Sequence, residues 1–330
     1  MKSIINMLVC GITLVCTSQA LAIECARAST IVESTICESP QLVWLDSVLN
    51  DTYRNMMQLG NPQGVNKMTQ QWQRSRDVCT SSVCLRWAYL QGIGQLYHAP
   101  ESFSWSGEWW NTSATNGNGG RLIISNVNQW TFDFDAMVWG GTYKTTLRGN
   151  VRMFRGVGFV DNIKWGAGCP VIFIPHPDGK ITISSDNGGS CKLLMQRGMA
   201  IDGVYQRADN DPRPAAALLS MGIFPSKALD DRFRQLVGKD YQQYVNVANS
   251  ITYATDLDDI NATVVTLALK GDASHHAAII MYTPDGRIWA SRVMPKSDKQ
   301  REVHTDYMTT EKGQKNPPNT INHWRALFDS

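Results

Sequence analysis

The sequence predicts a multidomain α plus β protein. A disulfide-stapled helical hairpin domain, a central antiparallel β-sheet or barrel module and a C-terminal α+β domain follow one another. Apolar residues recur at helical spacing up to about residue 98, and the next hundred residues alternate between polar and apolar around glycine-rich turns. The last segment mixes both patterns. We therefore expect domains at residues 23–99, 103–207 and 215–330.

Residues 1–22 have the pattern of a secretory signal peptide. Lys2 gives a positive start, an apolar run follows from about Ile4 to Val15, and Ala20-Leu21-Ala22 matches the A-x-A cleavage pattern. The run is too short to span a membrane, and no second long apolar run follows. We expect cleavage near Ala22, export to the periplasm and no membrane span in the mature chain. A retained anchor helix is the alternative.

The first segment after the leader has helical periodicity. Three apolar stripes begin at Pro40, Val65 and Val83, and Gly60-Asn61-Pro62 separates the first two. Short connections between consecutive helices favour antiparallel packing.

An even number of cysteines in an exported chain predicts disulfides. Four of the six cysteines that remain lie in the helical segment. Antiparallel helices would place the start of one beside the end of the next, which favours Cys37–Cys79 and Cys25–Cys84. The crossed pairs Cys25–Cys79 and Cys37–Cys84 stay open. Because no second close cysteine pair follows Cys79 and Cys84, we expect no metal site there, with or without His98.

The middle segment is predicted to form an antiparallel sheet or small barrel, because short strand-like runs alternate with turn residues. Pro177-Asp178-Gly179 is a turn signal between two such runs, and Cys169–Cys191 would close that hairpin. The predicted strands are Arg121–Ser125, Thr131–Met137, Thr145–Met153, Val171–Ile174 and Lys180–Ser184.

A polar, proline-containing linker is expected at Ala208–Pro214, and the last segment then mixes helices with strands. Ser226 can cap a helix through Gln235, which Gly238 would end. The remaining predicted elements are strands at Thr263–Leu269, Ala277–Tyr282 and Arg287–Val293 and a helix at Ile321–Phe328.

Composition and motifs exclude several functions. The net charge is only +2 and no basic stripe carries interleaved aromatics, which argues against nucleic acid as a partner. No glycine-rich phosphate loop, G-x-S-x-G elbow or H-E-x-x-H pair is present. We expect no enzyme activity, no catalytic residue, no metal and no cofactor. An enzyme using His275 or His304 is a remaining alternative.

Carboxylates and tryptophans suggest three weaker candidate sites. Asp133 and Asp135 share one face of a strand, as a glycosidase pair would, although a solvated sheet face is the expected reading. Trp109 and Trp110 could form a sugar platform, but tryptophans in a sheet more often belong to the core. The cluster Asp256, Asp258 and Asp259 lacks a calcium-loop pattern, so we expect a solvated loop.

Ser274-His275-His276 is the strongest candidate for a contact surface. It lies in a tight polar connection, Gly271–His276, between two predicted strands. Imidazoles in a loop can donate or accept hydrogen bonds and carry charge near neutral pH. We expect His276, His275 and Ser274, in that order, to contact a partner, against the alternative of a loop without a task.

The cysteine-containing segment resembles the N-terminal domain of the LprI-type lysozyme-inhibitor family. The resemblance depends on Cys25-Ala26-Arg27-Ala28, Ile36-Cys37, Trp72 with Arg76-Asp77, and Cys79 with Cys84-Leu85. It covers about 75 residues, roughly a quarter of the mature chain. The middle segment is similar to a β module that often follows that domain, at Gly107-Glu108-Trp109 and at 202–207.

The last segment resembles the Ivy-like lysozyme inhibitors in its strand, Gly-Asp loop, strand and Pro-Asp-Gly-Arg-Ile-Trp-Ala pattern, and in a closing helix with Trp324. In those inhibitors a cysteine-bounded loop with a histidine enters the lysozyme cleft. Ser274-His275-His276 stands in the matching place without the flanking cysteines.

These resemblances imply a periplasmic lysozyme inhibitor. Its partner would be lysozyme or another peptidoglycan hydrolase, and it would protect the cell wall by occluding a muramidase cleft. A glycan- or peptidoglycan-binding envelope module without inhibitory activity is the alternative.

Overall fold

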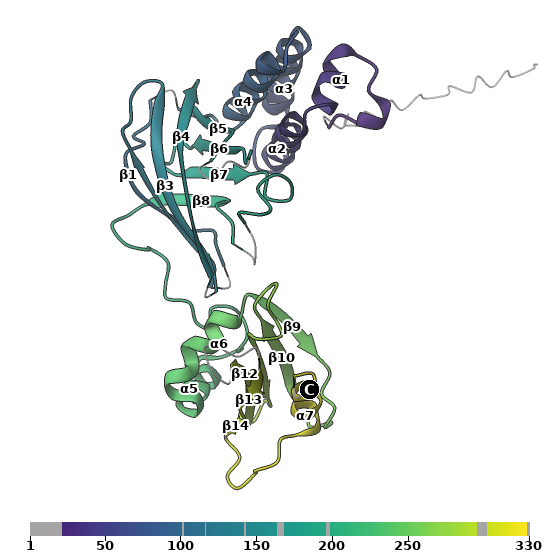
Figure 1. Cartoon of the computed structure of the whole chain (residues 1–330), viewed down its shortest axis with the longest axis vertical. Coiled ribbons are helices and arrows are strands. Elements are labelled where there is room, and N and C mark those ends of the chain that lie inside the picture. Colours follow the sequence, from purple (N-terminus) through teal and green to yellow (C-terminus); the bar gives the residue numbers. More distant parts are fainter. Residues whose placement is uncertain are drawn as a thin grey trace, which may run out of the picture.

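The structure is a computed structural model that describes residues 22–100, 102–115, 117–141, 143–163, 168–195, 199–295 and 302–328. Four α-helices, an eight-stranded barrel and a second sheet with its own helices follow one another along the chain (Figure 1). The predicted α plus β class is confirmed, whereas the division into three domains stays a prediction. All of the predicted signal peptide except Ala22 lies outside the described residues.

The helical part begins where side chains can cap helix ends. Thr30, Ser39, Asn61 and Ser81 each accept a hydrogen bond from a backbone N–H group in the first turn that follows. The first two predicted apolar stripes lie on buried helix faces, whereas Val83, which opens the third, is 53% exposed, and Leu85 and Tyr89 of the same helix join the core instead. The elements are η1 (Cys25–Arg27), α1 (Ile31–Cys37), α2 (Pro40–Leu59), α3 (Pro62–Asp77) and α4 (Ser82–Leu96).

The two disulfides of this part join sequence neighbours. Cys25 pairs with Cys37 and Cys79 pairs with Cys84, with a Cα–Cα distance of 5.5 Å in each. The predicted Cys37–Cys79 and Cys25–Cys84 pairs were therefore wrong, and so were the crossed pairs. The prediction overlooked α1, which carries Cys37 back beside η1, and the short α3–α4 connection, which brings Cys79 and Cys84 together.

The middle part is a closed antiparallel barrel in which the first strand pairs with the last. Inward side chains fill it, among them Trp109, Phe132 and Phe173. The predicted Cys169–Cys191 disulfide is present, with its Cα atoms 4.6 Å apart. The strands are β1 (Gly107–Asn111), β2 (Gly119–Ser125), β3 (Thr131–Gly140), β4 (Tyr143–Phe154), β5 (Val157–Val160), β6 (Val171–Pro175), β7 (Ile181–Ser185) and β8 (Gly203–Arg207).

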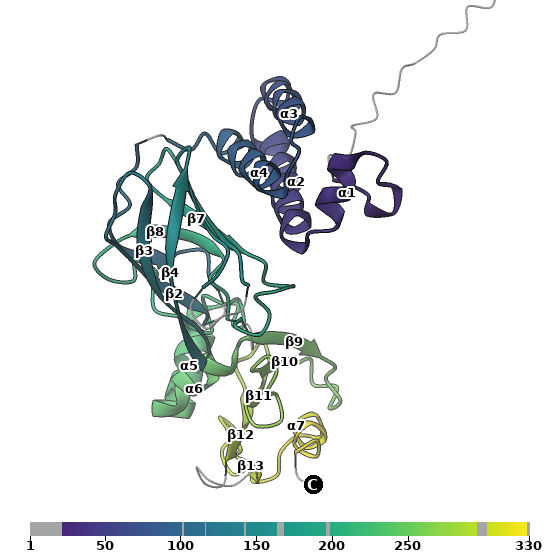
Figure 2. The same ribbon diagram turned by 45° about the horizontal axis from the view of Figure 1, so that its top comes forward.

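Strands β5 and β6 are buried on both faces. Their inward residues join the barrel core, while Val157, Phe159, Ile172 and Ile174 pack into the core of the helices. The helix α4 contacts β4 and β5, and Figures 1 and 2 show the helices on this side of the barrel. A strand covered on both faces reads as a continuous apolar run, which is why Val171–Ile174 does not alternate.

The last part is an antiparallel sheet in the order β13-β12-β11-β10-β9, with β14 also paired to β12. The central strand β11 sends Ala278 and Ile280 toward α5 and α6, and Ile279 and Met281 toward α7. Its elements are α5 (Lys227–Val237), η2 (Gly238–Asp240), α6 (Tyr241–Val247), β9 (Ser250–Ala254), β10 (Thr263–Ala268), β11 (Ala277–Tyr282), β12 (Ile288–Pro295), β13 (Val303–Thr305), β14 (Met308–Thr309) and α7 (Asn319–Arg325).

The predicted linker has no helix or strand, but Arg213 fastens it to the barrel. Its guanidinium group donates to the carbonyl oxygens of Ala114 and Asn118 at 2.9 and 2.8 Å and pairs with Asp211 at 2.8 Å. A second contact follows at Asn249, whose amide donates to the side-chain oxygen of Asn118 at 2.7 Å. The chain is therefore in polar contact with the barrel both before α5, through Arg213, and after α6, through Asn249.

Candidate functional site: the histidine loop

The connection between β10 and β11 forms a compact loop that Asp272 organises through its backbone. The N–H groups of His275 and His276 donate to the Asp272 carbonyl oxygen at 3.2 and 3.0 Å. At the base of the loop, the N–H of Leu269 donates to the His276 carbonyl at 2.9 Å. Gly271 has a φ of +84°, which glycine adopts without strain.

The Asp272 carboxylate also holds both imidazoles. Its Oδ1 lies 2.9 Å from His275 Nδ1, and its Oδ2 lies 3.8 Å from His276 Nε2. The side chains of His275 and His276 are 40% and 35% exposed, so both are held without being hidden. Ser274 Oγ lies 3.0 Å from His275 Nδ1, which brings the three predicted contact residues together around one carboxylate.

One side of the loop rests on the barrel. The Tyr143 hydroxyl donates to Asp272 Oδ2, and its ring meets the His276 ring edge-on with centroids 6.3 Å apart. Gly141 makes this approach feasible, because a Cβ there would lie 2.5 Å from Leu269 Cδ1. The β3–β4 turn therefore packs against the histidine loop and supports it.

The charge of Asp272 is stabilised in this setting. Partial burial acts to raise the pKa of Asp272, but the hydrogen bonds from Tyr143 and His275 and the nearby imidazoles outweigh it and hold the pKa below its ordinary value. An ionised Asp272 accepts a hydrogen bond from the Nδ1–H group of His275, which leaves Nε2 as the nitrogen that can reach a partner. The loop can thus present a fixed imidazole to a carboxyl group.

Sequence reasoning found the histidines but missed both groups that position them. Asp272 carried a local signal, since a Gly-Asp pair between two strands is typical of a turn. Tyr143 carried none, because it lies 129 positions away in the sequence and approaches only in the folded chain.

The two tryptophans considered as a sugar platform are largely buried, in line with the expected core packing. Trp109 is 0% exposed inside the barrel, so it cannot stack on a ligand. Trp110 is half-buried, donates from Nε1 to the Ala208 carbonyl at 3.0 Å and lies beside Arg121. Both rings are thus part of the barrel's own packing.

A different tryptophan of the barrel is exposed. Trp130 is 67% exposed, and the Asn128 side chain fixes its turn by accepting from the N–H groups of Trp130 and Thr131 at 2.8 and 2.9 Å. The ring borders a hollow of about 600 Å³ whose wall also includes Gln129, Phe154 and Arg155. An aromatic face beside amide and guanidinium groups suits a sugar ring.

The acidic candidates have structural partners. Asp133 accepts from the amides of Asn126 and Asn150, both at 2.8 Å, and Asp135 pairs with Arg148 at 2.7 Å on the outer face of the barrel. They are therefore engaged on a polar sheet face, in line with the expected reading.

The second acidic cluster shapes a turn and a helix start. Asp256 accepts from the N–H groups of Asp258, Ile260 and Ala262, and Asp258 accepts from those of Asn319 and Thr320. The carboxylate of Asp258 thus satisfies the open N–H groups at the start of α7.

His304 is exposed on β13, at the same end of the sheet as His275 but two strands away. Across the described ranges, no group of three or more His, Cys, Asp or Glu side chains could hold a metal ion. No helix within those ranges is long and apolar enough to cross a bilayer.

Comparisons with known proteins add no relative. No protein-family model matches the chain, and neither the curated proteins nor the solved structures that were searched contain a match.

Proposed function

We propose that this protein is an exported lysozyme inhibitor that occludes a muramidase cleft with the loop between β10 and β11. The observation that carries the proposal is the Asp272 anchor, which binds His275 directly and lies 3.8 Å from His276, with both imidazoles half-exposed. The three disulfides are consistent with an exported protein. The chain would act as a binder without catalytic residues or cofactors.

The chemistry of the partner fits this loop. A lysozyme cleft contains one protonated and one ionised carboxyl group, and a histidine can hydrogen-bond or ion-pair with either. A loop already held in its bound shape loses little conformational entropy on binding. The Ivy-like inhibitors have a cysteine-bounded loop. In this protein Asp272 and Tyr143 would keep the loop rigid instead.

The test is an inhibition panel with the mature chain in molar excess over c-, g- and i-type lysozymes. We expect loss of peptidoglycan lysis with at least one class, and an inhibition constant raised about tenfold or more in the His275→Ala/His276→Ala variant. His323→Ala is the matched control, because His323 is exposed on α7, away from the loop. Full lytic activity with every class would contradict the proposal.

The second candidate function is glycan binding by the barrel, which the exposed Trp130 favours. Its ring stands on a fixed turn beside the hollow of about 600 Å³, so it could stack on a pyranose without reorganising. A pull-down on insoluble peptidoglycan should then retain the protein and lose it in Trp130→Ala. Tyr253→Ala is the control, since Tyr253 is 62% exposed on β9 of the other sheet. Equal retention of both variants would exclude this site.

A further inference from the structure

We propose that the chain is cleaved at the Ala22–Ile23 bond and that the new α-amino group of Ile23 binds the buried carboxylate of Asp46. The proposal assigns a processing site and a binding site for its product. It depends on export of the protein but not on lysozyme inhibition, so each can fail separately.

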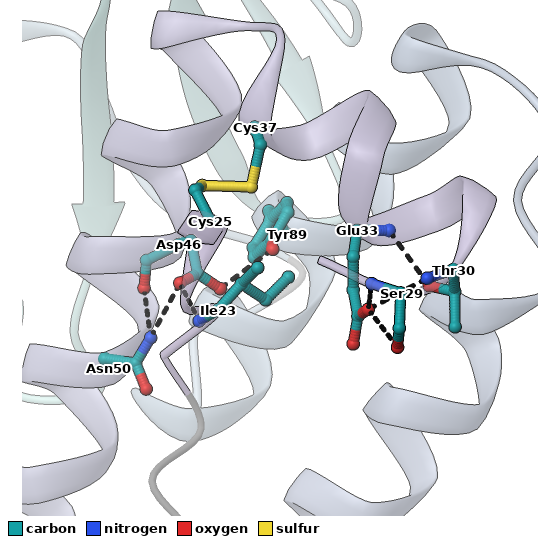
Figure 3. The surroundings of a disulfide bond; sticks show 9 residues. All are labelled: Ile23, Cys25, Ser29, Thr30, Glu33, Cys37, Asp46, Asn50 and Tyr89. Atoms are coloured by element: carbon teal, nitrogen blue, oxygen red, sulfur yellow. Dashed lines mark hydrogen bonds between the residues drawn. A yellow bond between two sulfur atoms is a disulfide. The ribbon is translucent and has the colours of Figure 1, made fainter. Parts of the chain in front are cut away.

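The receiving site is already built in the helical part (Figure 3). The nitrogen of Ile23 donates to Asp46 Oδ2 at 3.0 Å, and the Tyr89 hydroxyl donates to Oδ1 at 2.8 Å. Asn50 Nδ2 adds a third bond, to Oδ2 at 3.1 Å. Asp46 is only 6% exposed, so its charge has little help from water.

The scissile bond lies at the border between solvent and core. Ala22 is exposed, whereas Ile23 is half-buried and packs against the helical core. A leader would therefore leave the molecule at Ala22, where a peptidase can reach it. The Cys25–Cys37 disulfide holds the segment two residues beyond Ile23, which limits the entropy lost when the new terminus docks.

Hydrolysis changes the charge at this site. Water adds across the amide bond, the leader keeps the Ala22 carboxylate, and the Ile23 nitrogen becomes a primary amine. With an ordinary pKa of about 8 the amine takes up a proton at neutral pH. A neutral amide donor is thereby replaced by an ammonium group at hydrogen-bond distance from a carboxylate, which is a stronger contact.

Among the described residues, the cation that acts on the buried carboxylate is Arg76, which does not bond to it directly. Burial raises the pKa of Asp46 against the lowering effect of its hydrogen bonds from Ile23 and Tyr89. The charged group that faces it from α3 is Arg76, whose guanidinium is already paired with Asp77 at 2.7 Å. From the terminal segment, Glu24 and Arg27 pair with each other at the surface. The Ile23 ammonium would add a positive charge that is bonded directly to the carboxylate.

The experiment compares two forms of the mature protein, one starting at Ile23 and one that retains Ala22. We expect the form starting at Ile23 to melt about 5 °C higher at pH 7. Acetylation of its Ile23 nitrogen should abolish the difference, because the amide keeps a donor but loses the charge. The Asp46→Asn variant should also lose the difference in melting temperature between the two forms. The Asp51→Asn variant is the control and should keep it, because the ion pair of Asp51 with Arg54 lies at the surface of the same helix.

The pH dependence gives a further readout. Pairing raises the pKa of the amine above its unfolded value, so, wherever Asp46 is ionised, the added stability is fully present below about pH 8 and is lost as the pH rises through the folded value. N-terminal sequencing of the exported protein should give Ile23. Another first residue, or a melting difference that survives acetylation, would overturn the proposal, whatever the inhibition panel shows.

Discussion

Asp272 shows how much a single side chain decides in this protein. Its backbone carbonyl closes the histidine loop, and its carboxylate holds His275 and, more distantly, His276. The sequence predicted the histidines as contacts because their chemistry is local and visible. It could not predict that Tyr143 would complete the anchor, since that contact joins the barrel to the second sheet.

The Asp272→Asn variant should weaken inhibition without unfolding the protein. Loss of the charge weakens the bonds to His275 and Tyr143, so we expect an inhibition constant about tenfold higher, equivalent to about 1.4 kcal/mol. Asp231→Asn is the matched control, because Asp231 forms an exposed ion pair with Lys227 on α5. An unchanged constant in Asp272→Asn would show that the anchor does not matter for binding.

The lowered pKa of Asp272 also predicts how the loop responds to acid. A depressed pKa means that the carboxylate stabilises the fold above the ordinary value of about 3.9 and loses this effect as the pH falls through the folded value. The protection of the His275 and His276 amides from hydrogen exchange, relative to their intrinsic rates at each pH, should therefore stay high at pH 5 and fall under stronger acid. Equal exchange in wild type and Asp272→Asn at pH 5 would contradict this.

At the scale of elements, the helices followed their local signals and the disulfides did not. Helix starts at Ser39, Asn61 and Ser226 coincide with capping residues whose preference is written in the sequence. The cysteine pairing depended on α1, a short helix that begins at the Thr30–Glu33 capping box and places Cys37 beside Cys25. Overlooking one short element was enough to misassign two bridges.

The disulfide pairing can be checked by mass spectrometry without reduction. Trypsin cleavage after Arg76 and Arg86 releases residues 77–86, which should contain an internal disulfide between Cys79 and Cys84. Cross-linked peptides that join Cys79 to Cys37 would instead restore the pairing expected from helix packing.

The loop lengths also predict a stability order. Chain-entropy arguments give about 2 kcal/mol for the bridge that spans 5 positions and about 3 kcal/mol for Cys169–Cys191, which spans 22. Paired serine substitutions followed by urea unfolding should therefore show the larger loss for Cys169–Cys191. The opposite order would contradict this.

At the scale of the whole molecule, the helical core includes side chains from the outer face of the barrel. Phe159 and Ile172 face away from the barrel interior and into the helical cluster, so neither part buries its apolar surface alone. The barrel in turn contacts the loop between β10 and β11 through Tyr143 and Gly141. These contacts couple the histidine loop to a part of the chain far from it in the sequence.

Ile172→Ala should destabilise the helices and the barrel together. Ile172 is 0% exposed, and removing its side chain from a packed core costs about 2–5 kcal/mol. Helical circular dichroism and tryptophan fluorescence should then show coincident transitions, both shifted to lower urea concentration. Ile123→Ala on β2 is the control, because Ile123 is 38% exposed and should shift them little. Separate transitions for the two signals would show that the parts unfold independently.

The sequence by itself determined the mixed fold class, the helix starts at Pro40 and after the Ser226 cap, the hairpin bridge Cys169–Cys191 and the histidine loop as a connection between strands. Each depends on residues close in sequence, whose side chains set local backbone geometry or periodicity. Only the tertiary structure decided the barrel closure of β1 on β8, the neighbouring pairs Cys25–Cys37 and Cys79–Cys84, and the anchoring of the loop by Tyr143. The physical reason is that these contacts join segments far apart in the sequence. They form only when the folded chain brings two surfaces together, and no local sequence pattern specifies which surfaces these are.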